Sequence, residues 1–186
     1  MLKRILIILS VIALTMGYAF YQKKSLESQL ALESNPTSVL KKLPESTFET
    51  LESTPYIIAD QQFELLVVHF WGTWCAPCEA ELPELLTFIK QFEGRPGVKF
   101  LLVAVNDEVV KINKHLKGME LPAGITWLLD NKDIHRTEYG TTRVPETYVF
   151  SSDKTLLRKF LGPQIWKNPT FFQTFDEFYL TSTRKL

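Results

Sequence analysis

The sequence predicts an α/β domain with a central mixed β-sheet flanked by helices, on three observations. Two nearly continuous apolar runs, Leu65–Trp71 and Val98–Val105, have the composition of strands buried on both faces of a sheet. Between them, Ala76–Phe92 carries apolar residues at the three-and-four spacing of an amphipathic helix. Toward the carboxyl end, Thr147–Phe150 and Leu156–Phe160 flank a polar turn, the pattern of an antiparallel hairpin. Alternating strands and helices followed by a hairpin indicate a mixed sheet.

The composition is that of a globular protein of ordinary size. The chain has 186 residues, and one hydrophobic core ordinarily occupies about 100 to 200. Apolar residues make up 45% and charged residues 23%, a balance typical of a globular rather than a disordered or fully membrane-embedded chain. The 21 basic and 21 acidic residues cancel without a long run of either sign, so nucleic acid is not expected as a partner.

The amino-terminal segment, residues 1–21, is predicted to be an export signal or a membrane anchor. Lys3 and Arg4 precede an apolar stretch from Ile5 to Tyr21, which meets the lower length limit for crossing a bilayer. An uncleaved anchor is favoured because no clean small-residue cleavage sequence is present, and a cleaved signal is the alternative. In both cases the basic end stays inside, so the remainder is expected outside the cytoplasmic membrane of a bacterium, in the periplasm.

Residues 22–42 are polar and are predicted to be a tether, and residues 43–186 are predicted to form the compact domain. Its first part, Ser46–Ile58, mixes Thr, Phe, Tyr and Ile and is expected to form a pair of short strands. Asp107–Leu116 is expected to be a helix, and Ile125–Leu129 a short strand.

The last helices are predicted from their boundaries. Asn131–Tyr139 is expected to form a brief helix closed by Gly140, because glycine favours the left-handed conformation that ends many helices. Pro169 is expected to start a terminal helix, because proline is well tolerated in the first turn. That helix presents an aromatic face: Phe171, Phe172, Phe175, Phe178 and Tyr179.

The two cysteines of the chain form a Cys-Ala-Pro-Cys sequence between the end of a buried strand and the start of a helix. A helix amino terminus presents unpaired N–H groups and a partial positive charge, and both favour a thiolate over a thiol. Cys75, at the tip of the turn, is therefore the predicted nucleophile. Cys78 is placed to attack the resulting mixed disulfide and to release the product, which leaves a Cys75–Cys78 disulfide.

Two other interpretations of the cysteine pair remain open at this point, a zinc half-site and a pair of inert thiols. Zinc requires four ligands, and the other candidates of the usual kind are His69, His115 and His135, none of them paired at ligand spacing. His115 and His135 are predicted to be surface residues. No metal site and no cofactor are expected.

Two segments resemble a known group of proteins. Phe70–Pro83, with the sequence FWGTWCAPCEAELP, closely resembles the active-site segment of the TlpA/ResA/CcmG group of extracytoplasmic thioredoxin-like proteins. Val144–Thr147 resembles the second motif of that group, and the similarity covers roughly residues 43–180. The resemblance implies a thioredoxin-like fold. It also implies a cis peptide between Val144 and Pro145 that faces the cysteines and can pair with an extended substrate, where a trans proline is the alternative.

The same resemblance extends to single residues. Trp74 is expected to form part of an exposed groove beside the nucleophilic cysteine. Glu81 matches an acidic residue of the group, and a carboxylate near the sulfurs can shuttle protons and raise thiol pKa values; a solvated helix glutamate is the alternative. His69 stands where thioredoxins carry a buried aspartate, and it is interpreted either as a base beneath the disulfide or as a hydrogen-bonded core histidine.

The predicted function is that of a thiol-disulfide oxidoreductase, and specifically a reductase of extracytoplasmic protein disulfides. Ala76 and Pro77 supply neither charge nor a side-chain donor to stabilise a thiolate, which favours a low reduction potential. A reductase in that location needs a membrane thiol-disulfide electron donor. Its substrates are disulfide-containing proteins, with apocytochrome c in cytochrome c maturation as one candidate.

Three alternatives from other classes are weighed against this prediction. A copper-assembly protein of the same fold usually has three residues between its cysteines, whereas this chain has two. A peroxidase uses a Pro-Thr-Cys sequence that is absent here. An inactive binding module is disfavoured by the intact cysteine pair and the Val144–Pro145 motif.

Overall fold

The computed structural model describes residues 15–18 and 40–183. Contacts divide the chain into two units, Met1–Asn35 and Pro36–Leu186. In the first unit, residues 15–18 are helical; the rest of the predicted anchor (1–21) and nearly all of the predicted tether (22–42) lie outside the described residues. Within the described ranges, no helix combines the length and the apolar character needed to cross a membrane.

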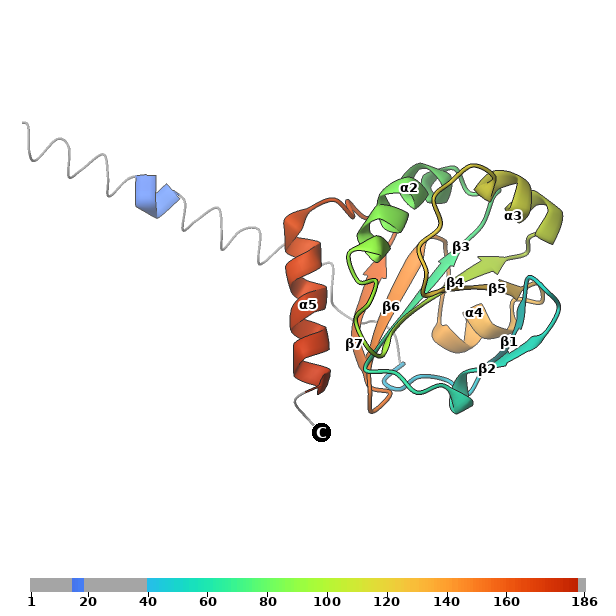
Figure 1. The fold of residues 1–186 in the computed structure, drawn as a ribbon, viewed down its shortest axis with the longest axis horizontal. Coiled ribbons are helices and arrows are strands. Elements are labelled where there is room, and N and C mark those ends of the chain that lie inside the picture. The colour runs from blue at the N-terminus through green and yellow to red at the C-terminus, as the bar shows by residue number, and fades with distance from the viewer. Residues whose placement is uncertain (1–14, 19–39, 184–186) are drawn as a thin grey trace, which may run out of the picture. The chain divides into compact units, whose positions relative to one another are not determined.

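The second unit contains a seven-stranded mixed sheet in the order β2-β1-β5-β4-β3-β6-β7. Its central strands β3, β4 and β5 run parallel (Figure 1). On one side β6 pairs antiparallel with β3 and β7 with β6; on the other side β1 pairs antiparallel with β5 and β2 with β1. The predicted mixed sheet is therefore confirmed. The strands are β1 (Thr47–Thr50), β2 (Pro55–Ile57), β3 (Leu65–Trp71), β4 (Val98–Val105), β5 (Ile125–Asp130), β6 (Glu146–Ser151) and β7 (Leu156–Leu161).

Helices cover both faces of this sheet and create two hydrophobic layers. All seven residues of β3 are buried, as expected for a strand covered on both faces. One layer lies under α2, α3 and α5 and includes Trp166 and Phe175. The other layer lies under α4 and contains Tyr139 and Tyr148, and Figure 1 shows α4 across the sheet from α2. The helices are α2 (Ala76–Lys90), α3 (Val109–Leu116), α4 (Ile134–Tyr139) and α5 (Pro169–Thr183), with a 3-10 turn at Ile58–Asp60.

Two helices begin later than the sequence predicted, each after an acidic residue. Helix α3 starts at Val109 rather than at Asp107, whose carboxylate accepts the Glu108 N–H at 2.9 Å. Asp130, at the end of β5, accepts the backbone N–H groups of His135 and Arg136 at 3.4 and 2.7 Å, so α4 starts at Ile134 rather than at Asn131. The helix α2 ends at Lys90, two residues before the predicted end. Gly140 adopts the left-handed conformation at the end of α4 (φ 70°), as predicted.

The prediction that His115 and His135 are surface residues is confirmed only in part. Both are half-buried, with side chains 20% and 17% exposed. The His115 ring lies 6.1 Å from that of Trp71, and the His135 ring lies 4.3 Å from that of Phe48. Each histidine therefore packs its ring against an aromatic residue, a contact that short-range sequence patterns do not encode.

Candidate active site

The two cysteines form a disulfide at the amino terminus of α2. Cys75 is the residue that caps the helix, and its sulfur accepts the backbone N–H of Cys78 at 3.3 Å. Cys75 and Cys78 are 6% and 1% exposed, so Cys78 is the more deeply buried of the two. The predicted position of the pair, between strand β3 and helix α2, is confirmed. A thiolate on Cys75 would gain the helix-terminus N–H and the partial positive charge there.

The turn before the disulfide is held by a residue that the sequence analysis missed. The Asp107 carboxylate, which is 6% exposed, accepts the Thr73 backbone N–H at 2.6 Å and the Thr73 hydroxyl at 2.9 Å. It also accepts the Glu108 N–H at 2.9 Å. The available signal was its position two residues after the end of the buried strand β4, because the carboxyl ends of parallel strands commonly carry site residues.

Trp74 is 57% exposed beside the disulfide, as expected for a groove residue. Its indole N–H donates to the Val105 carbonyl at 2.8 Å, which fixes the ring on the surface. Gly72 permits this position, because a Cβ atom there would lie 2.7 Å from the indole nitrogen. Trp74 is thus an anchored, exposed aromatic surface.

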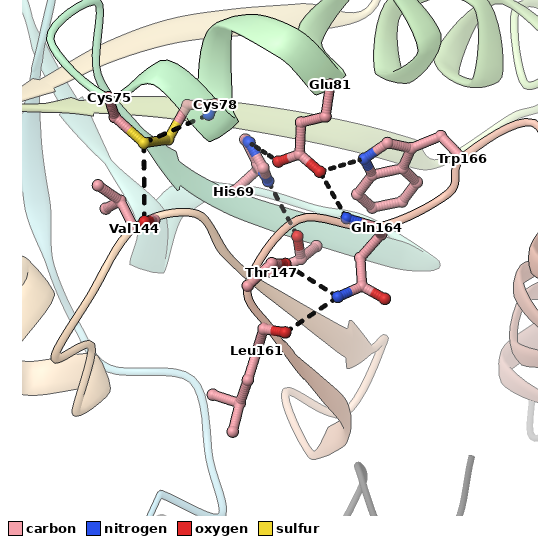
Figure 2. Close-up of polar contacts among 10 residues, drawn as sticks. His69, Cys75, Cys78, Glu81, Val144, Thr147, Leu161, Gln164 and Trp166 are labelled. Carbon is pink, nitrogen blue, oxygen red and sulfur yellow. Dashed lines mark hydrogen bonds and ion pairs between the residues drawn. A yellow bond between two sulfur atoms is a disulfide. The ribbon is translucent and has the colours of Figure 1, made fainter. Parts of the chain in front are cut away.

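The Val144–Pro145 peptide is cis, so the prediction for this bond is confirmed. The Val144 carbonyl oxygen lies 3.7 Å from Cys75 Sγ, which brings this loop against the disulfide (Figure 2). The Pro145 carbonyl accepts the Gly162 N–H at 2.9 Å. Within residues 40–183 the Val144 N–H has no hydrogen-bond partner.

Glu81 is buried, at 6% exposure, which excludes the interpretation as a solvated helix glutamate. Its Oε2 accepts the Gln164 backbone N–H at 2.7 Å and the Trp166 indole N–H at 2.9 Å. Burial raises the pKa of Glu81 to about 7, although these two hydrogen bonds act in the opposite direction. Glu81 lies three positions after Cys78 on α2, and residues at that spacing share a helix face. The carboxyl group therefore changes protonation near neutral pH.

His69 is buried in the same region, on β3, at 2% exposure. Its Nδ1 lies 2.9 Å from the Thr147 hydroxyl, and its Nε2 lies 3.5 Å from Glu81 Oε1. Burial lowers the pKa of His69 to about 3, so the ring is neutral at physiological pH and its contact with Glu81 is not an ion pair. The interpretation as a hydrogen-bonded core histidine fits these contacts.

The pH dependence of stability should differ between the wild type and Glu81→Gln. A folded-state pKa above the ordinary value of 4.5 means that the folded protein is stabilised while the carboxyl is protonated. This stabilisation is lost as the pH rises from 4.5 through about 7. Between pH 4.5 and 8, the free energy of unfolding of Glu81→Gln should rise by about 3 kcal/mol relative to that of the wild type. Urea unfolding of the oxidised protein at both pH values measures this difference.

The control for this prediction is Glu84→Gln. Glu84 lies on the same helix but is half-exposed, with a 2.8 Å contact to the exposed Lys167. Its replacement should change the unfolding free energy by less than about 1 kcal/mol at both pH values. An equal pH dependence in wild type and Glu81→Gln would contradict the prediction.

A buried ion pair follows the cis peptide and was also missed by the sequence analysis. The Glu146 carboxylate, next to Pro145, lies 2.9 Å from Lys159 Nζ, with side chains 4% and 10% exposed. The Tyr148 hydroxyl donates to the same carboxylate at 2.9 Å. Lys159 also donates to the Gly140 carbonyl at 3.1 Å. The cis-proline loop is therefore followed directly by a buried carboxylate that is paired with a lysine and a tyrosine hydroxyl.

An intact disulfide at a helix amino terminus, facing a cis-proline on an α/β sheet, defines a thioredoxin-like thiol-disulfide oxidoreductase. Residues 39–159 match the family model described as AhpC/TSA family. The chain belongs to the AhpC/TSA family. Among the described residues, no group of three or more His, Cys, Asp or Glu side chains is arranged to hold a metal ion.

Similar proteins agree with this classification. The chain is 25% identical to the thiol-disulfide oxidoreductase ResA of Geobacillus thermodenitrificans over 147 residues, which cover 79% of each chain. It is 22% identical to ResA of Bacillus subtilis over 157 residues, 83% of this chain and 82% of that one. The predicted resemblance to the TlpA/ResA/CcmG group is therefore confirmed.

Solved structures confirm the thioredoxin-like fold. The Chlorobium tepidum structure described as a putative thiol:disulfide interchange protein DsbE aligns with a TM-score of 0.62 and 19% identity, over 78% of this chain and 99% of that one. StoA from Bacillus subtilis aligns with a TM-score of 0.56 and 20% identity, over 70% of this chain and 99% of that one.

Proposed function

We propose that this protein is a membrane-tethered reductase of extracytoplasmic protein disulfides. The observation that carries the proposal is the Cys75–Cys78 pair at the amino terminus of α2, against the Val144–Pro145 peptide. The reduced pair would supply two electrons and two protons to a substrate disulfide.

The proposed reaction has two exchange steps. The Cys75 thiolate attacks one sulfur of the substrate disulfide and displaces the other as a thiolate, which takes up a proton. Cys78 then loses its proton and attacks Cys75 Sγ. This step breaks the mixed disulfide, forms the Cys75–Cys78 bond and releases the second substrate thiolate for protonation. The substrate is reduced by two electrons and the cysteine pair is oxidised by two.

Glu81 is the proposed proton acceptor for Cys78. Cys78 is 1% exposed, so bulk water has little access to its thiol. Glu81 lies on the same face of α2 and has a pKa raised to about 7, which suits a group that takes a proton from a thiol and later releases it. The rate of the second exchange step should therefore rise as the pH increases through this value.

The substrate segment is proposed to bind between Trp74 and the cis-proline loop. Trp74 offers an exposed indole face on one side of the disulfide. The unpaired Val144 N–H on the other side can bond an extended backbone, as in strand addition. Side chains of Trp74, Val144 and Pro145 would then contact residues next to the substrate cysteine.

The direction of electron flow is proposed to be reduction of the substrate. Ala76 and Pro77 provide no side-chain donor or charge to the thiolate. Of the acidic residues on the first turns of α2, Glu79 contacts His115 and Glu84 contacts Lys167, while Glu81 is buried without a cation at neutral pH. A buried anion three positions after Cys78 on the same helix disfavours a thiolate on that cysteine and lowers the reduction potential. A measured potential near about −120 mV would overturn this direction.

The proposed location is the outer face of a bacterial cytoplasmic membrane. Lys3 and Arg4 followed by the apolar stretch to Tyr21 support an anchor, with residues 22–42 as tether and residues 43–186 as the exported domain; cleavage to a soluble periplasmic form is the alternative. A membrane thiol-disulfide protein would return electrons to the oxidised pair. Apocytochrome c, whose cysteines must be reduced before haem attachment, is a candidate substrate.

Trapping of mixed disulfides tests the proposal. In the native host, Cys78→Ser should accumulate covalent complexes through Cys75, because the second exchange step cannot occur. The complexes should be found in the membrane fraction, be released by dithiothreitol and be absent from the Cys75→Ser/Cys78→Ser double variant. Failure to trap any exported protein would count against the proposed function.

A further inference from the structure

The two oxygens of the buried Glu81 carboxyl have different surroundings. Oε2 accepts two N–H groups, from Gln164 and Trp166. Oε1 has no hydrogen-bond partner among the described residues, and His69 Nε2 lies 3.5 Å from it (Figure 2). Oε2 is therefore occupied as an acceptor, and Oε1 is the oxygen that remains for a proton. The imidazole ring is placed to interact with this oxygen.

The imidazole ring is held at its other nitrogen by a group that can donate or accept. His69 Nδ1 lies 2.9 Å from the Thr147 hydroxyl, and the two residues are register partners on β3 and β6. A hydroxyl can act as donor or as acceptor, whereas a neutral imidazole has one nitrogen of each kind. Both tautomers of His69 can therefore satisfy Thr147. The protonation state of Glu81, the group beside Nε2, therefore determines which tautomer forms.

We propose that His69 is a positioning residue that remains neutral and changes tautomer with the protonation of Glu81, so that the buried carboxyl has a partner in both states. This inference rests on the proposed function only for the source of the proton, the Cys78 thiol. It assigns to His69 a defined part in proton transfer, beyond that of a hydrogen-bonded core histidine.

The two states differ by one proton. When Glu81 is ionised, His69 carries its proton on Nε2 and donates to Oε1, and Nδ1 accepts from the Thr147 hydroxyl. When Glu81 is protonated, its O–H on Oε1 donates to Nε2, and the ring proton is on Nδ1 and donates to Thr147. In the net change the Cys78 S–H bond breaks and an O–H bond forms on Glu81, while the ring exchanges its Nε2–H bond for an Nδ1–H bond, so His69 carries one ring proton in both states. No imidazolium is formed, in keeping with the burial that lowers its pKa to about 3.

The groups that contact this pair come from two parts of the fold. Strand β6 contributes Thr147, and the segment after β7 contributes the Gln164 and Trp166 N–H groups; Cys78 lies three positions before Glu81 on α2. The Trp166 ring also packs edge-on against His69, at 6.2 Å between centroids. Within residues 40–183, no Lys or Arg side chain contacts Glu81, and the His69 ring beside it is neutral. The Glu81 carboxyl is therefore the group whose titration the His69 ring should report.

Nitrogen-15 NMR of the histidine rings tests this inference directly. The full chain, labelled at histidine and kept oxidised in detergent micelles, contains three histidines, and the variants His115→Gln and His135→Gln assign the remaining signals to His69. The disulfide does not titrate, so no thiol contributes. The protonated and unprotonated ring nitrogens of a neutral histidine have widely separated shifts. We expect Nε2 to carry the proton at pH 9 and Nδ1 to carry it at pH 5, with the midpoint at the Glu81 pKa of about 7.

The matched control is Glu81→Gln, which keeps the size of the side chain but does not titrate. Its His69 shifts should be independent of pH between 5 and 9. A wild-type ring that stays in one tautomer across this range, or that becomes an imidazolium, would overturn the inference, and so would a pH-dependent exchange that persists in Glu81→Gln. None of these results depends on substrate turnover, so they are separate from the outcome of the trapping experiment.

Discussion

Replacement of Cys75 with serine is expected to reduce the rate of disulfide reduction to the uncatalysed background, a loss on the order of 10⁴-fold or more. A serine hydroxyl does not ionise near neutral pH, so neither the helix-terminus charge nor the Cys78 N–H, 3.3 Å from the sulfur, can activate it. The measurement is insulin reduction with dithiothreitol as electron source, for the purified Cys75→Ser variant and the wild type.

Cys78→Ser is the matched variant for this experiment. It keeps the nucleophile and should react once with an excess of a small disulfide, giving one mixed disulfide per chain by mass spectrometry. Cys75→Ser should give none, because Cys78 is 1% exposed. Equal insulin reduction by wild type and Cys75→Ser would refute the enzymatic assignment of the pair.

The largest stability loss is expected for Lys159→Met. This change leaves the Glu146 carboxylate, 4% exposed, without the cation that lies 2.9 Å away. Removal of one member of a buried ion pair typically costs about 3 to 5 kcal/mol, because the remaining charge is neither solvated nor paired. Urea unfolding at pH 7 should show this loss in the oxidised protein.

Two further variants distinguish the cost of leaving Glu146 unpaired from the cost of losing a lysine side chain. Lys167→Met removes a cation that is 74% exposed and lies 2.8 Å from Glu84, so its cost should be below about 1 kcal/mol. The double variant Lys159→Met/Glu146→Gln removes both charges and should recover more than half of the loss. If Lys159→Met were as stable as Lys167→Met, the buried pair would have no role in stability.

The parts of the fold that follow from local periodicity were predictable from the sequence. The strands β3 and β4 and the helix α2 came close to their predicted bounds, because apolar runs and amphipathic spacing are local signals. The order of the strands was not predictable in this way. β1 pairs with β5, across more than seventy residues of sequence, through contacts that no short window contains.

The same distinction between local signals and distant contacts applies to the residues of the candidate site. Cys75, Cys78 and Pro145 lie in motifs, and the disulfide and the cis peptide are found where those motifs predicted them. The burial of Glu81 was open, because Glu79, Glu81 and Glu84 look alike in the sequence of α2. It is determined by Trp166, which lies 85 positions further along the chain. Asp107 and Lys159 were missed for the same reason, since their partners are distant in sequence.

The connection between β7 and α5 has an unusual requirement for exact length. Surface connections ordinarily tolerate inserted residues. Here the Gly162 N–H bonds the carbonyl of the cis-proline, and two residues later the Gln164 N–H bonds Glu81. One short stretch of backbone thus connects the cis-proline loop to the buried Glu81 carboxyl. A single added or deleted residue would break one of the two attachments, so this connection is a poor place for a tag, a label or a grafted peptide.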